Sequence, residues 1–354
     1  MERTTMQQQV DRHCRAYPLL QPEDLFKFIH HSAFGCGHLI GDASAAEEWL
    51  RQEMDTCGDG GGIELLPHGI CRVHLGYLKA LGVSARSFAR LFAFSAQKAV
   101  PGAAAAEQSL AAALDMAREG RLPFSFDVFS AAAGSWRKAG FPAIHHSDTF
   151  RDTYHPAYRV LHTGHAALLP LLAAIDGKLA EKERTVVAIE GGAGSGKSTL
   201  AALLERIYGC TTVHMDDFFL RREQRTPQRY ATPGGNIDHE RFLAEVVTHL
   251  KDGKTFRYRP FDCATFTVSE GYNLTPTALT VVEGCYSTHP ALGDYADVSV
   301  FVEIDTDKQR ARIEARNSPD FAVRFFNEWI PLEQAYFAAH DPAARCHIQL
   351  EVDL

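Results

Sequence analysis

The sequence predicts an α/β fold for residues 185–354, with a parallel sheet sandwiched between helices, and a mainly helical domain in residues 1–175 before it. From residue 185, short β-branched runs alternate with helix-like segments, which is typical of a parallel sheet covered on both faces. A glycine-rich segment, 191–196, lies directly between the first of these runs and the first helix-like segment. Residues 1–175 instead show helical spacing of apolar residues and many alanines.

The first half of the chain is predicted to consist mainly of helices. Apolar residues at helical spacing indicate one buried face: Leu25, Phe26, Ile29 and Phe34. The alanine-rich run 103–113 predicts another helix, which ends before Gly120. The glycine-rich run 58–62 predicts a flexible loop. The charged segment 176–184 is predicted to be a linker, or the end of a helix that joins the domains.

The second half is predicted to alternate strands and helices. The predicted strands are 186–189, 212–215, 280–283 and 298–304. The predicted helices are 200–208, 240–250, 307–316 and 328–338. Residues 185–354 are long enough to form a complete hydrophobic core of their own.

Composition limits the partners of the protein. The 36 Lys and Arg residues against 44 Asp and Glu residues give a net charge of −8, so no overall field attracts nucleic acid or an anionic membrane. The longest apolar stretch, 166–175, is shorter than the ~20 residues of a membrane span, and the N-terminus lacks a signal-peptide core. We expect a cytoplasmic protein that binds neither nucleic acid nor membrane, and a homo-oligomer remains open.

The eight cysteines include no CxxC pair. In a chain of 354 residues this pattern predicts reduced, mostly buried thiols and not a disulfide framework.

The glycine-rich segment has the spacing of a phosphate-binding loop. It fits the pattern G-x-x-x-x-G-K-[ST] and consists of Gly191, Gly192, Ala193, Gly194, Ser195, Gly196, Lys197, Ser198 and Thr199. The glycines let backbone N–H groups surround phosphate oxygens, and the following helix adds its N-terminal dipole. Lys197 can reach the β- and γ-phosphates of a nucleotide, and Ser198 can ligate Mg²⁺.

Two carboxylates lie at the ends of predicted strands. Ligands bind at the carboxyl ends of parallel strands, so Asp216, after the strand next to the loop, is expected to face the γ-phosphate. Asp216 can accept a proton from an attacking hydroxyl or hold the metal, but Asp216 and Asp217 can also begin a loop or cap a helix. Glu283 must reach a water-filled cleft or a cation, or pair with a structural arginine.

The segment from Val186 to about Phe337 resembles the uridine kinase and phosphoribulokinase branch of small-molecule P-loop kinases. Besides the loop, the resemblance rests on 214–219 (HMDDFF), 233–239 (PGGNIDH), 281–284 (VVEG) and a looser stretch, 312–333. It implies a P-loop NTPase fold of the NMP-kinase-like type, with ATP and Mg²⁺ as cofactors. The implied activity is phosphoryl transfer to a hydroxyl of a small-molecule acceptor.

The resemblance also implies roles for three carboxylates. Asp216 would act as the catalytic base, and Glu283 would lie beside Mg²⁺. Asp238 would bind the acceptor, although its residue type fits equally well an N-cap for the helix 240–250.

Several arginines fall where the resemblance places a lid. They are Arg310, Arg312, Arg316 and Arg324. Arginines in a closing lid stabilise the charge of a transferring phosphoryl group. Arg316 is expected to be the catalytic arginine, and Arg312 and Arg324 are expected to contact substrate. The alternative is a solvated basic helix face.

The acceptor side departs from the family in one place. Residues 258–262 resemble the family's acceptor-site hairpin, and Phe219 and Phe261 are expected to contact the acceptor. Phe261 and Phe266 stand near the positions where nucleoside kinases carry polar groups that recognise the base. A phenyl ring cannot hydrogen-bond a pyrimidine edge, so uridine and cytidine are not expected to be good acceptors.

The first half contains polar clusters with no recognised motif. They are His30, His31, Cys36 and His38; Cys71 and His74; and the stretch 145–159. Imidazole and thiolate are zinc ligands, but packed structural histidines or loops that hold an acceptor explain the clusters as well. The stretch 145–159 is expected to line an acceptor site or the face between domains.

Two further classes of function remain open. One is an NTP-hydrolysing switch that acts on a protein partner through the N-terminal domain. The other is a nucleotide-binding scaffold without turnover. A switch does not need the acceptor apparatus and lid arginines, and these residues favour the kinase over it. The intact Lys197–Ser198 pair, Asp216 and Glu283 argue against the scaffold.

Overall fold

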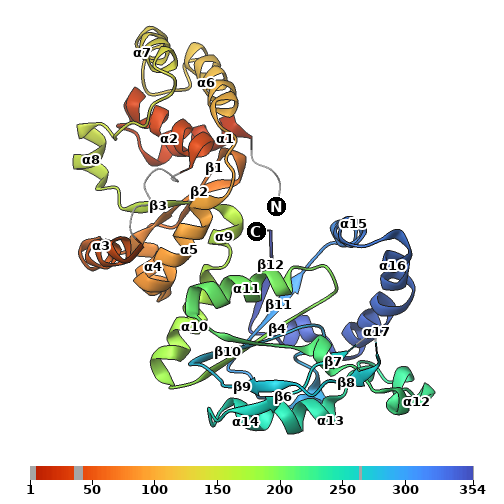
Figure 1. Ribbon diagram of the computed structural model, residues 1–354. Helices are drawn as coiled ribbons and strands as arrows, with labels where there is room; N and C mark the ends of the chain where they lie inside the picture. Colours follow the sequence, from red (N-terminus) through yellow and green to blue (C-terminus); the bar gives the residue numbers. More distant parts are fainter. Residues whose placement is uncertain (1–4, 36–42, 263–264, 354) are drawn as a thin grey trace. The chain divides into compact units, whose positions relative to one another are not determined.

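The computed structural model describes residues 5–35, 43–262 and 265–353, and the chain divides into two compact units, Met1–Ala166 and Ala167–Leu354 (Figure 1). The division comes before the predicted boundary at residue 175. Helix α10 (Leu169–Glu181) contacts strands β4 (Thr185–Gly191) and β11 (Val298–Glu303) of the second unit. Leu169, Leu171 and Leu172 of α10 are fully buried and the helix continues to Glu181, so the predicted linker at 176–184 is in large part the end of a packed helix.

The first unit combines helices with a small antiparallel sheet, β1-β2-β3, which the sequence did not predict. The strands are β1 (Ile63–Leu66), β2 (Ile70–His74) and β3 (Tyr158–His162). The helices are α1 (Met6–Ala16), α2 (Pro22–Phe34), α3 (Ala43–Thr56), α4 (Leu75–Leu81), α5 (Ala85–Gln97), α6 (Ala103–Arg118), α7 (Phe126–Lys138), α8 (Asp148–Tyr154) and α9 (Thr163–Ala166), with a 3₁₀ turn η2 (Pro67–Gly69).

Aromatic side chains fill the core of this unit. The Phe26 ring stacks on Phe129 and on Trp136, at centroid distances of 5.3 and 4.9 Å. The predicted alanine-rich helix is α6, and its small side chains pack against α2 and α7. Burial of these rings, worth ~1.5–3 kcal/mol for each fully buried phenylalanine, supplies much of the stability of the unit.

The second unit contains a five-stranded parallel sheet in the order β12-β11-β4-β10-β5. The remaining strands of this sheet are β5 (Thr211–His214), β10 (Leu279–Glu283) and β12 (Ile348–Glu351). The four predicted strands are confirmed. The sequence analysis missed β12, which lies at the sheet edge and buries only Leu350, so it carries little hydrophobic signal.

Helices and two small antiparallel ribbons complete this unit. The ribbons pair β6 (Phe256–Tyr258) with β9 (Tyr272–Leu274), and β7 (Phe261–Asp262) with β8 (Thr267–Val268). The helical segments are α11 (Lys197–Tyr208), η3 (Met215–Phe218), η4 (Arg222–Gln224), α12 (Pro227–Ala231), α13 (His239–Phe242), η5 (Leu243–Val247), α14 (Thr248–Leu250), η6 (Pro290–Leu292), α15 (Thr306–Arg316), α16 (Pro319–Arg324), η7 (Phe325–Trp329), α17 (Ile330–His340) and α18 (Pro342–Arg345).

The central strand β4 is buried on both faces. Val186 and Ala188 belong to one core cluster with Phe242 and Val246 of α13 and η5. Because side chains alternate along a strand, Val187 and Ile189 point to the opposite face, where α10 and α11 contact the sheet (Figure 1). The sheet is therefore sandwiched as predicted, and its carboxyl edge stays free to carry the loops.

In the described part of the chain, no helix is long and apolar enough to cross a membrane. The cysteines that the structure describes are all unpaired: Cys14, Cys57, Cys71, Cys210, Cys285 and Cys346. Cys71, Cys210 and Cys285 are buried, whereas Cys36 and Cys263 lie outside the described residues.

Candidate functional site

The glycine-rich loop joins the end of β4 to the start of α11, as the motif requires. Gly191 has φ +141°, and a Cβ there would lie 2.5 Å from the backbone oxygen of Val302 on β11. Gly196, at φ +109°, is the N-cap of α11. These backbone conformations exclude ordinary side chains, so the loop keeps its shape only with glycine.

Lys197 and Ser198 stand at the start of α11. The Lys197 Nζ donates a 2.8 Å hydrogen bond to the backbone oxygen of Gly192, so the ammonium group lies across the loop. The Ser198 hydroxyl is 3.2 Å from Oε1 and 3.3 Å from Oε2 of Glu283, at the end of β10. The two residues predicted to hold the metal are thus adjacent.

Glu283 is buried and also accepts a 2.7 Å hydrogen bond from Nδ1 of His214, which the sequence analysis did not assign. Burial opposes ionisation of Glu283, but the His214 hydrogen bond and the charge of Lys197 outweigh it and lower its pKa. The hydrogen bond to Glu283 raises the pKa of His214. Glu283 is therefore ionised, and its partners are His214 and Ser198, not the arginine of the alternative interpretation.

Asp216 and Asp217 have different surroundings in η3. The Asp216 carboxylate accepts no hydrogen bond from a described residue. Partial desolvation raises its pKa, aided by the charges of Glu283 and Asp217 and opposed by Lys197. Asp217 instead accepts a short hydrogen bond from the buried Tyr258 hydroxyl. Asp217 is therefore held by Tyr258, whereas no described side chain occupies the Asp216 carboxylate.

Asp238 is the N-cap of α13. Its Oδ1 accepts a 3.1 Å hydrogen bond from the backbone N–H of Arg241. The other oxygen, Oδ2, is buried without a hydrogen bond and lies 3.8 Å from the guanidinium groups of Arg221 and Arg241. The capping interpretation therefore describes one oxygen of Asp238, and the other oxygen is buried beside two guanidinium groups.

The predicted lid arginines have different contacts. Arg312 donates to the backbone oxygens of Gly194 and Ser195, at 3.2 and 3.1 Å, and so supports the loop from behind. Arg310 and Arg324 are exposed, and they pair with Glu314 of α15 and Glu328 of η7, respectively. Arg316, at the end of α15, is exposed and forms no ion pair with a described residue. Arg316 is thus the one of these four with an uncommitted guanidinium.

The phenylalanines expected at the acceptor side form one aromatic group. The rings of Phe219 and Phe261 are 6.4 Å apart, and those of Phe261 and Phe266 are 6.3 Å apart. The Arg225 guanidinium lies 4.7 Å from the Phe266 ring centre. Phe261 is buried and Phe266 is exposed, so the exposed part of this group is an apolar ring with the Arg225 cation beside it.

Two buried carboxylates next to the loop were not predicted as site residues. Glu190, the residue before the loop, accepts hydrogen bonds from the backbone N–H groups of Gly191, Tyr286 and Thr288. Glu333 of α17 accepts a 2.9 Å hydrogen bond from the N–H of Ala193. Glu190 could have been found from the sequence, because it is a glutamate inside an apolar strand. Glu333 could not, because its partner, Ala193, is distant in sequence.

The histidine and cysteine clusters of the first unit show no metal geometry in the described ranges, where no three such side chains converge on one point. Cys36 and His38, part of one cluster, lie outside these ranges. Cys71 is buried in β2, and burial raises its pKa to about 12, so it is a protonated thiol. His31 and His146 are engaged in buried hydrogen bonds with Arg72 and Asp24.

No family model matches the chain. The uridine kinase of Staphylococcus aureus strain JH9 is 27% identical over 150 residues, which cover 39% of this chain and 71% of the relative. The uridine kinase of Staphylococcus aureus strain Newman gives the same figures. A solved structure described as a possible uridine kinase from Bacillus stearothermophilus is 21% identical, covers 51% of this chain and 98% of that chain, and has a TM-score of 0.38. The predicted resemblance is confirmed, since part of the chain is similar to uridine kinases.

Proposed function

We propose that the second unit is an ATP-dependent kinase that transfers the γ-phosphoryl group to a hydroxyl of a small metabolite. One observation carries this proposal: Lys197, Ser198, Glu283 and Asp216 converge where β4, β10 and β5 end. A parallel sheet presents ligand sites at this edge. The similarity to uridine kinases supports the same class of reaction.

The chain offers suitable groups for ATP and Mg²⁺. Ser198 and Glu283 provide adjacent hard oxygen ligands, the type that Mg²⁺ prefers. The loop offers backbone N–H groups at a helix N-terminus, which suit phosphate. Bound Mg·ATP supplies the phosphoryl group and neutralises part of its charge.

In this proposal the protein positions groups and moves one proton. The acceptor oxygen bonds to the γ-phosphorus while the bond from that phosphorus to the β–γ bridging oxygen breaks, and Asp216 accepts the hydroxyl proton. A raised pKa makes Asp216 a stronger base than an ordinary aspartate. Lys197, with Arg316 brought in by movement of the lid, stabilises charge on the transferring group.

The acceptor is proposed to lack a pyrimidine base. The support is the Phe219, Phe261 and Phe266 group, which leaves base-edge atoms unpaired. The test is to incubate the full chain with Mg·ATP and panels of sugars, sugar acids, vitamins and nucleosides, and to detect phosphorylated product by mass spectrometry. One product that depends on acceptor supports the proposal, and ADP formation independent of every acceptor contradicts it.

A further inference from the structure

The first unit contains a pocket of about 460 Å³ that is separate from the loop of the second unit. This volume is within the range of about 300–1,000 Å³ that small-molecule sites occupy. Much of its lining comes from α2, α3 and the segment 145–160, which includes most of the polar stretch singled out in the sequence. The pocket is therefore a candidate ligand site with a definite set of side chains.

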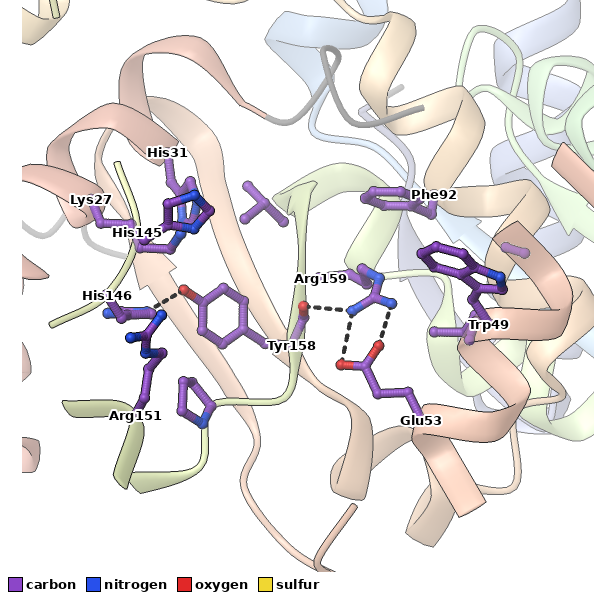
Figure 2. Close-up of a pocket in the computed structure, with 14 residues that line it drawn as sticks. Lys27, His31, Trp49, Glu53, Phe92, His145, His146, Arg151, Tyr158 and Arg159 are labelled. Atoms are coloured by element: carbon purple, nitrogen blue, oxygen red, sulfur yellow. Dashed lines mark hydrogen bonds and ion pairs between the residues drawn. The ribbon is translucent and has the colours of Figure 1, made fainter. Parts of the chain in front are cut away.

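One end of the pocket is aromatic. Figure 2 shows Trp49 and Phe92 at this end, beside the ion pair between Arg159 and Glu53. The Trp49 side chain is 74% exposed, although tryptophan usually buries its indole. Arg159 and Glu53 form two hydrogen bonds, 2.6 and 3.3 Å, and neutralise each other. This end thus offers a flat apolar surface with little net charge.

The other end carries hydrogen-bond donors. Lys27, His31, His145, His146 and Arg151 line it, on the far side of Tyr158 (Figure 2). The half-buried Lys27 ammonium donates to the backbone oxygen of Ile144 at 2.9 Å, and no described carboxylate lies within ion-pair distance of it. A partly desolvated cation without an ion-pair partner favours an anion beside it.

The hydrogen bonds beneath this end fix which groups donate. Arg72 cannot accept a hydrogen bond, so its 3.3 Å contact with Nδ1 of His31 makes that nitrogen an acceptor and leaves Nε2–H as the donor of a neutral imidazole. Burial and the charge of Arg72 lower the pKa of His31, in agreement with a neutral imidazole. His31 is thus locked as a neutral donor beside the Lys27 cation.

A second chain of hydrogen bonds sets Tyr158. Asp24 accepts from Nδ1 of His146 at 2.7 Å, so Nε2 of His146 accepts from the Tyr158 hydroxyl at 2.6 Å. The Tyr158 hydroxyl therefore donates its hydrogen to His146 and not to a ligand. Arg151 is ion-paired with Asp148, so the donors that remain for a ligand come from Lys27, His31 and His145, and this end suits an acceptor group with negative charge.

From these two ends we propose that the pocket binds a small planar-ring compound that carries a carboxylate or a phosphate. The ring lies against Trp49 and Phe92, and the anionic group lies near Lys27 and His31. This site is additional to the proposed kinase site, and its assignment does not depend on phosphoryl transfer.

The test uses indole-3-acetate and phenyl phosphate as probes, titrated into the full chain and followed by calorimetry and tryptophan fluorescence. Indole-3-ethanol and phenol keep the rings without the charge, and acetate and inorganic phosphate keep the charge without the ring. We expect at least one ring anion to bind about 10-fold or more tightly than both of its comparators, since a hydrogen bond to a charged group accounts for a difference of that size.

Two variants locate the binding. Lys27→Gln is expected to weaken binding of the ring anion about 10-fold. Lys138 is an exposed lysine of α7 outside the pocket, so Lys138→Gln leaves this affinity unchanged. Circular dichroism checks that both variants fold. Equal affinity for the neutral ring, an unaffected Lys27→Gln variant, or no binding of either ring anion up to millimolar concentration overturns the proposal. Loss of binding in Lys197→Ala would assign the anion to the other unit and also overturn it.

Discussion

The Oε2 of Glu333 accepts a 2.9 Å hydrogen bond from the backbone N–H of Ala193, across 140 residues of sequence. A carboxylate oxygen thereby bonds to one of the loop amides in the segment that the motif assigns to phosphate. Burial raises the pKa of Glu333 to about 7, although the charge of Lys197 and this hydrogen bond lower it. The contact therefore links the protonation state of Glu333, in α17, to the loop through Ala193.

Glu333→Gln should change how stability depends on pH. A carboxyl whose pKa rises from 4.5 to about 7 on folding stabilises the fold below pH 4.5, and this contribution is lost as pH rises through 7. The variant stays neutral, so its stability relative to the native chain should increase between pH 5 and pH 8 by on the order of 2–3 kcal/mol. Urea unfolding at both pH values measures this, and parallel pH profiles would show that Glu333 does not titrate as described.

Asp216→Asn should lower kcat sharply and leave the KM for ATP within a few-fold, because the acceptor hydroxyl loses its base. General base catalysis contributes ~10²–10⁴-fold. Steady-state kinetics with the acceptor found in the screen measures both constants. The neighbouring Asp217→Asn is the matched control: its carboxylate is bonded to Tyr258, so stability should fall while kcat changes little. If Asp216→Asn loses affinity for ATP and keeps kcat, Asp216 holds the metal instead.

Uridine and cytidine should be poor acceptors compared with the best compound of the panel. A base edge placed against Phe261 and Phe266 loses its hydrogen bonds to water and gains none, which costs ~1–3 kcal/mol for each unpaired group. The kcat/KM for each nucleoside, measured beside that of the best acceptor, decides this. An efficient reaction with uridine would restore the plain uridine kinase interpretation.

Local signals in the sequence predicted most of the second unit. The motif 191–199 predicted a strand, a loop and a helix. Phosphate binding requires glycine, lysine and serine at fixed positions within these nine residues, so the sequence alone reveals it. Asp216 and Glu283 were predicted as site residues from the rule that ligands bind where parallel strands end. The pairing of Ser198 with Glu283 could be expected from this rule, and the structure brings the two together.

Contacts distant in sequence could not be predicted. The β2–β3 pairing joins residues near 72 to residues near 160, and the contact of Arg312 with the loop depends on how α15 packs. The first unit was predicted as mainly helical because its three strands are short and its helices dominate the periodic signal. Its pocket depends on α2, α3 and β3 folding together, which no single segment reveals.

The division of the chain predicts which fragment is stable. Residues 167–354 should fold alone, whereas 185–354 should be less stable by several kcal/mol, since it lacks the fully buried Leu171, Leu172 and Ile175 of α10. Each such side chain contributes ~1.5–3 kcal/mol. Thermal unfolding of the two purified fragments compares them. Equal melting temperatures would mean that α10 adds nothing to this unit.

The central claim is that the loop around Lys197 serves phosphoryl transfer. Its most direct test is acceptor-dependent ADP release by the full chain and by Lys197→Ala. The control is Lys178→Ala, which changes a half-exposed lysine of α10 paired with Glu181. We predict that Lys197→Ala folds normally and loses ~10²–10³-fold or more in rate, as removal of an electrostatic stabiliser of the transition state does. The control should keep the native rate. A folded Lys197→Ala chain with near-native, acceptor-dependent ADP release would contradict the account.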